Sequence, residues 1–385
     1  MADQTTKIYL DSFGNTIKQQ VLKGTDEDAS EEILTIQNCF TQDHSSLQSS
    51  KTTIGDNITK YNYQYDKTPD SKLESLDVKN SNDESILTQQ LTYDKLGRTS
   101  SILTNDNILV TYKYLTSGDH TTNLVSKMYF NNSSDCLNYK YDDYGNITEV
   151  RHLNDLVARY KYDDLNRLIR EDNKELDKTC TYTYDAGGNI TQRREYVYTL
   201  VDNLEYEDYI PYTYTYGLTG WADQLLCYNG QTFTYDKIGN PTIYRDNVLE
   251  WAYGRRLDKF NNIEYKYNAS GIRTSKVVDG IKTNYVYNGS KLLQLTQGDH
   301  VMTFRYGVNG VAGFNLDGDE YLYKKNLQND IIGIFNEQNK QIAEYTYDAW
   351  GNVSCKILSE CPVYYSHNCT QKRAQIGSFL LSIVI

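Results

Sequence analysis

Proline is scarce in this chain, with 4 among 385 residues. Because proline removes a ladder hydrogen bond from a β-sheet, its scarcity is compatible with long, continuous strand pairing. The 7 cysteines are odd in number and scattered, without metal-ligand spacing, which favours reduced thiols over a disulfide framework or a zinc site. The 5 histidines are isolated, and their spacing supports no Ser/His/Asp or Cys/His catalytic group.

An excess of positive charge is also absent, with 39 Lys and Arg against 51 Asp and Glu. The formal net charge of −12 argues against nucleic-acid binding, which normally requires a basic surface. The apolar run from Phe379 to Ile385 is far too short to span a bilayer, and the polar start at Met1 does not resemble a signal peptide. We therefore expect no transmembrane segment, and a cytoplasmic location before any export.

Phenylalanine is rare relative to tyrosine, with 9 residues against 37. A dry core favours Phe, Leu and Ile, whereas tyrosine combines a large apolar ring with a polar tip. This bias predicts a large, thin and partly solvated β-sheet.

A short phrase recurs along the chain: two aromatic residues at alternate positions, an acid, two variable positions, then glycine and asparagine. The acid and glycine positions, with asparagine or arginine following in most copies, are Asp94 and Gly97, Asp142 and Gly145, Asp163 and Asn166, Asp185 and Gly188, Asp236 and Gly239, Asn268 and Gly271, and Asp348 and Gly351. A looser copy lies at residues 8–15. Repetition of this kind marks a scaffold.

Each copy predicts a strand, a tight turn and a second strand. Residues at i and i+2 point to one face of a strand, which suits the paired aromatics. Asp-x-x-Gly is typical of a type I turn in which the acid accepts backbone donors and the glycine adopts the left-handed conformation. Successive acids at Asp142 and Asp163 are 163 − 142 = 21 residues apart, enough for two strands with their connections.

Three dipeptides predict two-residue hairpin turns between these units: Asn229-Gly230, Asp279-Gly280 and Asn288-Gly289. No helical period is evident between residues 90 and 350. The predicted fold class is all-β, a long meander of antiparallel β-hairpins. We expect degenerate repeats over 1–90, a regular array over 91–310, a distinct segment over 311–353 and a divergent tail over 354–385.

These residues resemble the RHS, or tyrosine-aspartate (YD), repeat family over most of the chain. The region from Trp221 to Leu257 is similar to the segment that precedes the core-associated end of such proteins. The stretch from Tyr321 to Ile331, followed by Tyr347 to Asn352, resembles the start of the RHS repeat-associated core.

The resemblance implies a β-strip that spirals into a hollow shell or partial barrel. It implies a non-enzymatic protein without cofactors that encloses and helps deliver a C-terminal toxin in competition between bacteria. The implied partners are the toxin cargo or the remainder of a longer RHS protein, and the implied location is secreted or at the cell surface.

The similarity stops after Asn352, because no aspartate follows this residue. The aspartate-based self-cleavage residues of the family therefore map onto no position here. A tail of 385 − 353 = 32 residues is too short for an ordinary toxin domain, so we expect a shell fragment with a truncated tail.

Other interpretations of the same residues stay open. The turn acids could bind calcium, although each turn supplies about one carboxylate and calcium requires six to eight oxygens. The neighbours Asp142-Asp143 and Asp163-Asp164 could act as catalytic pairs, but adjacent residues at a strand end point to opposite sides. Tyrosine rings could stack on sugars, so a wall-associated glycan-binding adhesin is the alternative function, and a glycan-active enzyme ranks last.

Overall fold

The computed structural model describes residues 4–24, 31–67, 70–118, 120–218 and 220–358. The chain divides into two compact units. Unit 1 contains Met1–Lys113, Tyr129–Ser134 and Tyr214–Asp317, and unit 2 contains Tyr114–Met128, Asp135–Thr213 and Gly318–Ile385. The predicted tail over 354–385 lies mostly outside the described residues.

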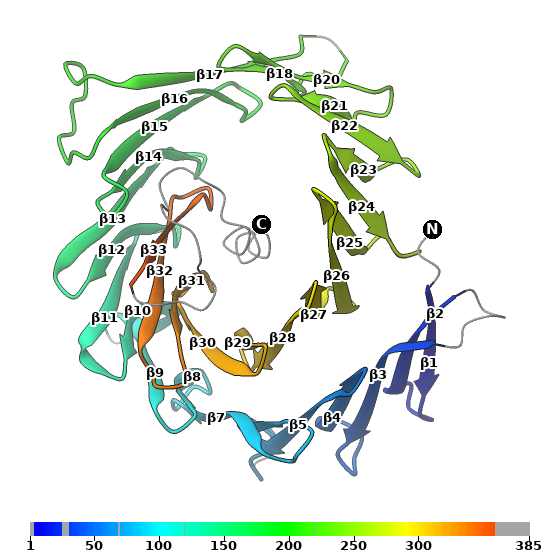
Figure 1. Ribbon diagram of the computed structural model, residues 1–385. Helices are drawn as coiled ribbons and strands as arrows, with labels where there is room; N and C mark the ends of the chain where they lie inside the picture. Colours follow the sequence, from blue (N-terminus) through cyan, green and yellow to red (C-terminus); the bar gives the residue numbers. More distant parts are fainter. Residues whose placement is uncertain (1–3, 25–30, 68–69, 119, 219, 359–385) are drawn as a thin grey trace. The chain divides into compact units, whose positions relative to one another are not determined.

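Two antiparallel sheets account for the strands of the described residues (Figure 1). The strands of the first sheet are β1 (Gln4–Leu10), β2 (Thr16–Lys23), β3 (Glu31–Phe40), β4 (Leu47–Ile54), β5 (Asn57–Tyr65), β6 (Leu73–Lys79), β7 (Ser85–Tyr93), β8 (Thr99–Thr104), β9 (Ile108–Ser117), β10 (His120–Phe130), β11 (Asn132–Tyr141), β12 (Ile147–His152), β13 (Asp155–Tyr162), β14 (Leu168–Asn173), β15 (Lys178–Tyr184), β16 (Ile190–Val197), β17 (Ile210–Tyr216), β18 (Leu225–Tyr228) and β19 (Gln231–Thr232).

The strands of the second sheet are β20 (Thr234–Tyr235), β21 (Pro241–Tyr244), β22 (Asn247–Ala252), β23 (Arg256–Phe260), β24 (Ile263–Tyr267), β25 (Arg273–Val278), β26 (Ile281–Asn288), β27 (Lys291–Gln297), β28 (His300–Gly307), β29 (Gly310–Leu316), β30 (Asp319–Lys325), β31 (Ile331–Phe335), β32 (Gln341–Tyr347) and β33 (Val353–Ile357). No helix occurs in the described residues, so the all-β prediction is confirmed. Accordingly, the described part of the chain contains no helix that could cross a membrane.

Strands that are consecutive in sequence pair as antiparallel hairpins, as the sequence predicted. In one example, β15 and β16 pair from Lys178 opposite Val197 to Tyr184 opposite Ile190. The register shifts at the tyrosine that precedes the turn acid, for example between Thr183 and Tyr184. This one-residue bulge is the expected partner of a type I turn with a left-handed residue. Residues 1–90, expected to be degenerate, contribute β1 to β6 and part of β7 with the same consecutive pairing.

Two of the three predicted dipeptide turns lie where the sequence placed them. Asn229 and Gly230 both have positive φ between the paired residues Tyr228 and Gln231, and Asp279-Gly280 behaves likewise. The third prediction was wrong by one residue. Asn288 pairs with Lys291, so the loop is Gly289-Ser290. A type II′ turn takes glycine at its first central position, which accounts for the shift.

Unit 1 holds an aliphatic core between β3, β4 and β27. Leu34, Ile36, Ile54 and Leu293 are buried together, with Val21, Val286 and Tyr306 packed against them. The tyrosine bias predicted a thin, partly solvated sheet. In unit 1 this sheet also packs on a cluster of buried aliphatic side chains.

Unit 2 contains a group of buried charged and polar side chains. Glu171, Asp172 and Thr179 on β14 and β15 are each at most 1% exposed. The hairpin of β32 and β33 contacts these strands through its turn: Asn173 Nδ2 donates to the Tyr347 carbonyl at 3.0 Å. Figure 1 shows this hairpin in orange.

Candidate functional site

The repeat turns are built around a carboxylate that accepts from its own loop. Asp142 Oδ1 accepts the backbone N–H groups of Tyr144 at 3.0 Å and Asn146 at 2.8 Å. Its Oδ2 accepts the Asn146 side-chain amide at 2.9 Å. Gly145 N–H closes the turn on the Asp142 carbonyl at 3.1 Å. Both carboxylate oxygens thus accept hydrogen bonds within five residues, which explains the phrase Asp-x-x-Gly-Asn in physical terms.

The structure places every sequence-predicted turn residue in a loop of this kind. The residues are Asp94, Gly97, Asp142, Gly145, Asp163, Asn166, Asp185, Gly188, Asp236, Gly239, Asn268, Gly271, Asp348 and Gly351. The glycine position has positive φ in each case, and Asn166 fills it with φ of 59°. In the copies at Asp94 and Asp163, an arginine replaces the final asparagine and donates from Nε to the acid at 2.7 Å.

Sequence reasoning missed three turns with the same geometry. Asn80, Asn326 and Asn336 each accept, on their backbone carbonyl, the N–H of the residue three positions on. The left-handed position there is Asp83, Asn329 and Asn339. The available signal was Asn-x-x-Asn or Asn-x-x-Asp, since asparagine replaces both the acid and the glycine at modest cost.

The tyrosine before the turn acid ties consecutive turns together. Its hydroxyl donates to a backbone carbonyl in a preceding strand, at 2.6–3.0 Å. Tyr306, which precedes Gly307 instead of an acid, makes the same bond. We call this set the tyrosine ladder: Tyr65 to Leu47, Tyr93 to Leu73, Tyr235 to Leu225 and Tyr306 to Leu292 in unit 1, and Tyr141 to Val125, Tyr162 to Ile147, Tyr184 to Leu168 and Tyr347 to Ile331 in unit 2.

Burial keeps the ladder hydroxyls protonated at any physiological pH. Desolvation is the main cause that raises the pKa of Tyr306 and of Tyr347 to about 12. Neighbouring turns are also bonded directly, as where Arg167 Nη1 donates to the Asp185 carbonyl at 3.2 Å. The sequence suggested that the tyrosines lie on a partly solvated sheet surface. In the structure, the hydroxyls of the ladder tyrosines donate hydrogen bonds between repeats.

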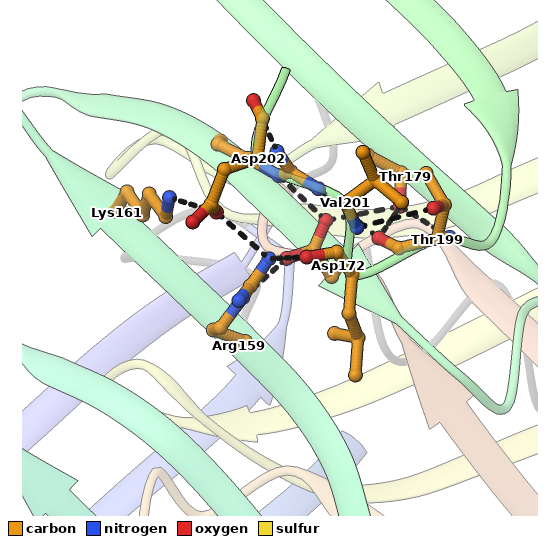
Figure 2. Close-up of polar contacts among 9 residues, drawn as sticks. Arg159, Lys161, Asp172, Thr179, Thr199, Val201 and Asp202 are labelled. Carbon is orange, nitrogen blue, oxygen red and sulfur yellow. Dashed lines mark hydrogen bonds and ion pairs between the residues drawn. The ribbon is translucent and has the colours of Figure 1, made fainter. Parts of the chain in front are cut away.

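Figure 2 shows a polar cluster of unit 2 around the buried Asp172, which we call the Asp172 lock. The Asp172 carboxylate is fully buried and accepts Arg159 Nε at 2.6 Å and Arg170 Nε at 2.7 Å. Thr179 Oγ1 lies 3.0 Å from Asp172 Oδ1. Two guanidinium groups and a hydroxyl therefore surround one carboxylate, which satisfies a charge that would otherwise be costly to bury.

The Asp172 lock also fastens the connection between β16 and β17 to the sheet. Arg170 Nη2 donates to the Thr199 carbonyl at 3.0 Å, and Arg159 Nη2 donates to the Leu200 carbonyl at 3.1 Å. At the exposed rim, Lys161 Nζ contacts Asp202 Oδ1 at 2.7 Å (Figure 2). Sequence reasoning missed this cluster because Arg159, Arg170, Asp172 and Thr179 lie outside the repeated phrase.

A second buried carboxylate holds the β32–β33 turn. Ala349 N–H lies 3.0 Å from both carboxylate oxygens of Glu171, and Asn173 Nδ2 donates to Oε1 at 3.2 Å. The Trp350 ring meets Tyr182 edge-on with centroids 5.5 Å apart. The contact between Glu171 and Ala349 was also not predictable from the sequence, since it joins residues 178 positions apart.

The polar contacts described above hold turns and strands together. Asp142 and Asp163 were considered above as members of catalytic pairs. Their carboxylate oxygens accept hydrogen bonds from their own turns, while Asp143 and Asp164 are exposed. Among the described residues, no group of three His, Cys, Asp or Glu side chains is placed to hold a metal ion. The five cysteines in this part of the chain are thiols, and burial raises the pKa of Cys180 to about 11, so it is a poor nucleophile.

Some known proteins are similar in sequence to about half of this chain, and some solved structures have a similar fold, although no family model matches it. A tRNA3(Ser)-specific nuclease WapA of Bacillus spizizenii is 31% identical over 203 residues, which are 50% of this chain and 8% of that protein. A tRNA nuclease WapA of Bacillus subtilis has the same identity and coverage. The chain thus spans less than a tenth of the length of these relatives.

Solved TcdB2-TccC3 structures match 90–93% of this chain. The complex with Cdc42 superimposes with a TM-score of 0.66 at 16% identity over 20% of the solved chain. The form without the hypervariable C-terminal region gives 0.61 at 14% identity, again over 20% of the solved chain. The chain is an RHS/YD-repeat protein. The resemblance inferred from the YD phrase is confirmed, and the turns and tyrosine ladder are the physical form of the RHS/YD repeat.

Proposed function

We propose that this chain is a non-enzymatic segment of an RHS shell that encloses a C-terminal toxin and helps to deliver it in competition between cells. The observation that carries the proposal is the tyrosine ladder. It bonds repeat to repeat along a sheet edge, so the strip can extend without a closed core. The toxin-assembly structures that share this fold, and the nuclease names of the relatives, support a role beside a toxin.

The catalytic activity named in the relatives is proposed to reside outside this segment. The matched residues are 8% of those proteins, and the carboxylates of Asp142 and Asp163 accept hydrogen bonds within their own turns. Incubation of the purified chain with bulk tRNA is expected to leave the tRNA intact. Cleavage that is abolished by a single substitution in a folded variant would overturn the non-enzymatic assignment.

The container role has its own test. The full chain is prepared with a protease-cleavable tag after Ile385 and, as a matched control, with the same tag before Met1. Enclosure predicts that the C-terminal tag resists the protease while the N-terminal tag is cut. Equal cleavage of both tags would contradict enclosure. We further propose that the parent protein acts outside the cell or at its surface, with the toxin or the remainder of a longer RHS protein as partner.

Glycan binding is the second candidate. Unit 1 exposes aromatic rings of the kind that stack on sugars, with Trp221 58% and Tyr253 70% exposed. Retention on immobilised cell-wall glycan that is lost in Trp221→Ala and Tyr253→Ala would favour this function. Unretarded passage of the native chain would exclude it.

A further inference from the structure

One face of β24, β25 and β26 in unit 1 carries two cations and no carboxylate. These three strands are consecutive in the second sheet (Figure 1). Tyr265 pairs with Lys276, and Tyr267 pairs with Arg273, so the four side chains lie on the same face. The one acid of these strands, Glu264, is next to Tyr265 in the chain and therefore lies on the opposite face.

The same face continues onto β26. Lys276 pairs with Thr283, so Tyr285 and Tyr287 follow Thr283 on this face at alternate positions. We call the face formed by the following residues the cationic face: Tyr265, Tyr267, Arg273, Lys276, Tyr285 and Tyr287.

Arg273 and Lys276 lie close together without a counter-ion. Within the described part of the chain, neither cation forms an ion pair with a carboxylate. Burial, followed by the positive charge of Arg273, lowers the pKa of Lys276 below its ordinary 10.5. The Arg273 guanidinium lies over the Tyr265 ring, 4.6 Å from the centroid. Two like charges held in this way repel each other, and a bound anion would relieve that repulsion.

The tyrosine hydroxyls of the cationic face also have no acceptor. Tyr267 and Tyr287 lie at the register shift before their turns, as the ladder tyrosines do, but neither forms a ladder bond. The hydroxyls of Tyr265 and Tyr285 likewise donate to no group among the described residues.

Tyr285 is the most telling of these residues because it is only 8% exposed. Burial raises the pKa of Tyr285 to about 12, and the charge of Arg273 opposes the rise, which places the hydroxyl near this cation. A buried hydroxyl without an acceptor costs free energy. The cationic face therefore has positive charge and a hydrogen-bond donor that the protein itself leaves unused.

We propose that the cationic face binds a tetrahedral oxyanion of the phosphate class, held by Arg273 and Lys276 as cations and by the Tyr285 hydroxyl as a donor. The guanidinium fork and the ammonium group match the oxygens of such an ion, and two positive charges match a dianion. The net charge of −12 disfavours an extended polyanion, so the expected ligand is a single phosphate group. The proposal concerns β24 to β26 and does not rest on the container role.

The first test is isothermal titration calorimetry of the full native chain with inorganic phosphate near neutral pH in a dilute chloride buffer. Saturable binding of one phosphate per chain is expected, and its absence would overturn the proposal. Methyl phosphate distinguishes the source of the group. Tighter binding of methyl phosphate would identify an esterified phosphate as the ligand, and tighter binding of inorganic phosphate would identify the free ion. Acetate that binds as tightly as phosphate would refute the phosphate class.

Charge variants locate the site. Arg273→Gln and Lys276→Gln should each weaken phosphate binding by about tenfold or more, because each removes a charge-assisted hydrogen bond. Lys282→Gln is the matched control: it removes one positive charge from an exposed position on β26 that pairs with Val277 on the opposite face. Equal losses in the three variants would show a general effect of net charge and would refute the cationic face as the site.

Tyr285→Phe separates a role in ligand binding from a role in stability. Because the Tyr285 hydroxyl has no partner to lose, the variant should keep the native Tm or exceed it without phosphate. It should nevertheless bind phosphate about threefold to tenfold more weakly. A lower Tm without phosphate, or unchanged phosphate affinity in the folded variant, would contradict the assignment of this hydroxyl as a donor to the ligand.

Discussion

The tyrosine ladder can be tested by removing one oxygen atom. Tyr184 donates its hydroxyl to the Leu168 carbonyl at 2.6 Å, while the Arg167 guanidinium lies over its ring, 4.7 Å from the centroid. Tyr184→Phe keeps the ring and the stacking and deletes only the donor. The Leu168 carbonyl then lies in a partly buried site without this partner.

Tyr184→Phe should lower the free energy of unfolding because a hydrogen bond is lost and because water has little access to the Leu168 carbonyl that accepted it. Together these terms predict a loss of about 1–2 kcal/mol in the free energy of unfolding. For a domain of 150–250 residues, each 1 kcal/mol lowers Tm by about 2–4 °C. Thermal unfolding followed by circular dichroism measures the effect, and hydrogen exchange should show about tenfold faster opening of β14 and β15 per 1.4 kcal/mol.

Tyr144→Phe is the matched control. Tyr144 is 78% exposed and lies in the turn after Tyr141, so the same deletion should change the free energy of unfolding by less than about 0.5 kcal/mol. Equal stability of Tyr184→Phe and the native chain, or equal losses in the two variants, would refute the ladder as a source of stability.

The remaining predictions concern the Asp172 lock, a crowded glycine and a turn acid. Asp172→Ala leaves Arg159 and Arg170 without their buried partner, so the free energy of unfolding should fall by about 3–5 kcal/mol in chemical unfolding. Asp202→Asn at the exposed rim should lower it by less than about 1 kcal/mol. Similar losses in the two variants would count against the Asp172 lock. Gly239→Ala would place a Cβ against the Trp221 ring at a residue with φ of +86°, so Tm should fall. Adding Trp221→Ala should recover the steric part of that fall. A double variant no more stable than Gly239→Ala alone would contradict the close approach.

The turn acid Asp185 should make the stability of the fold depend on pH. Hydrogen bonds from the Asn189 side chain and backbone hold the pKa of Asp185 below its ordinary 3.8. A carboxyl with a lowered folded-state pKa stabilises the fold above its unfolded pKa and loses that contribution as the pH falls below it. Asp185→Asn should therefore weaken the acid sensitivity of Tm below about pH 4, and a variant with the native acid profile would argue against the turn bonds.

The fold was largely readable from sequence because the repeat is local. Asp142, Gly145 and Asn146 form their turn from neighbours within five positions, so spacing alone predicts the hairpin, and repetition predicts that hairpins follow one another. Where two glycine-containing turn types compete, spacing is less decisive, as the one-residue shift at Gly289 shows.

The buried polar sites could not be read in this way. Glu171 meets Ala349 across 178 positions, and Arg159 reaches Leu200 across 41. Such contacts depend on which strands pack together, and a lone glutamate or arginine on a strand carries no sign of its partner. The asparagine-based turns at Asn326 and Asn336 were missed for a different reason, because asparagine there fills both the acid and the glycine positions.

Small-angle scattering of the purified full chain, with its mass in solution, tests the container most directly. The account predicts a monomer whose pair-distance distribution is that of a hollow or C-shaped particle, with low density near its centre. A solid globule, or an extended chain without a central deficit, would contradict the proposal that this RHS segment forms part of a container.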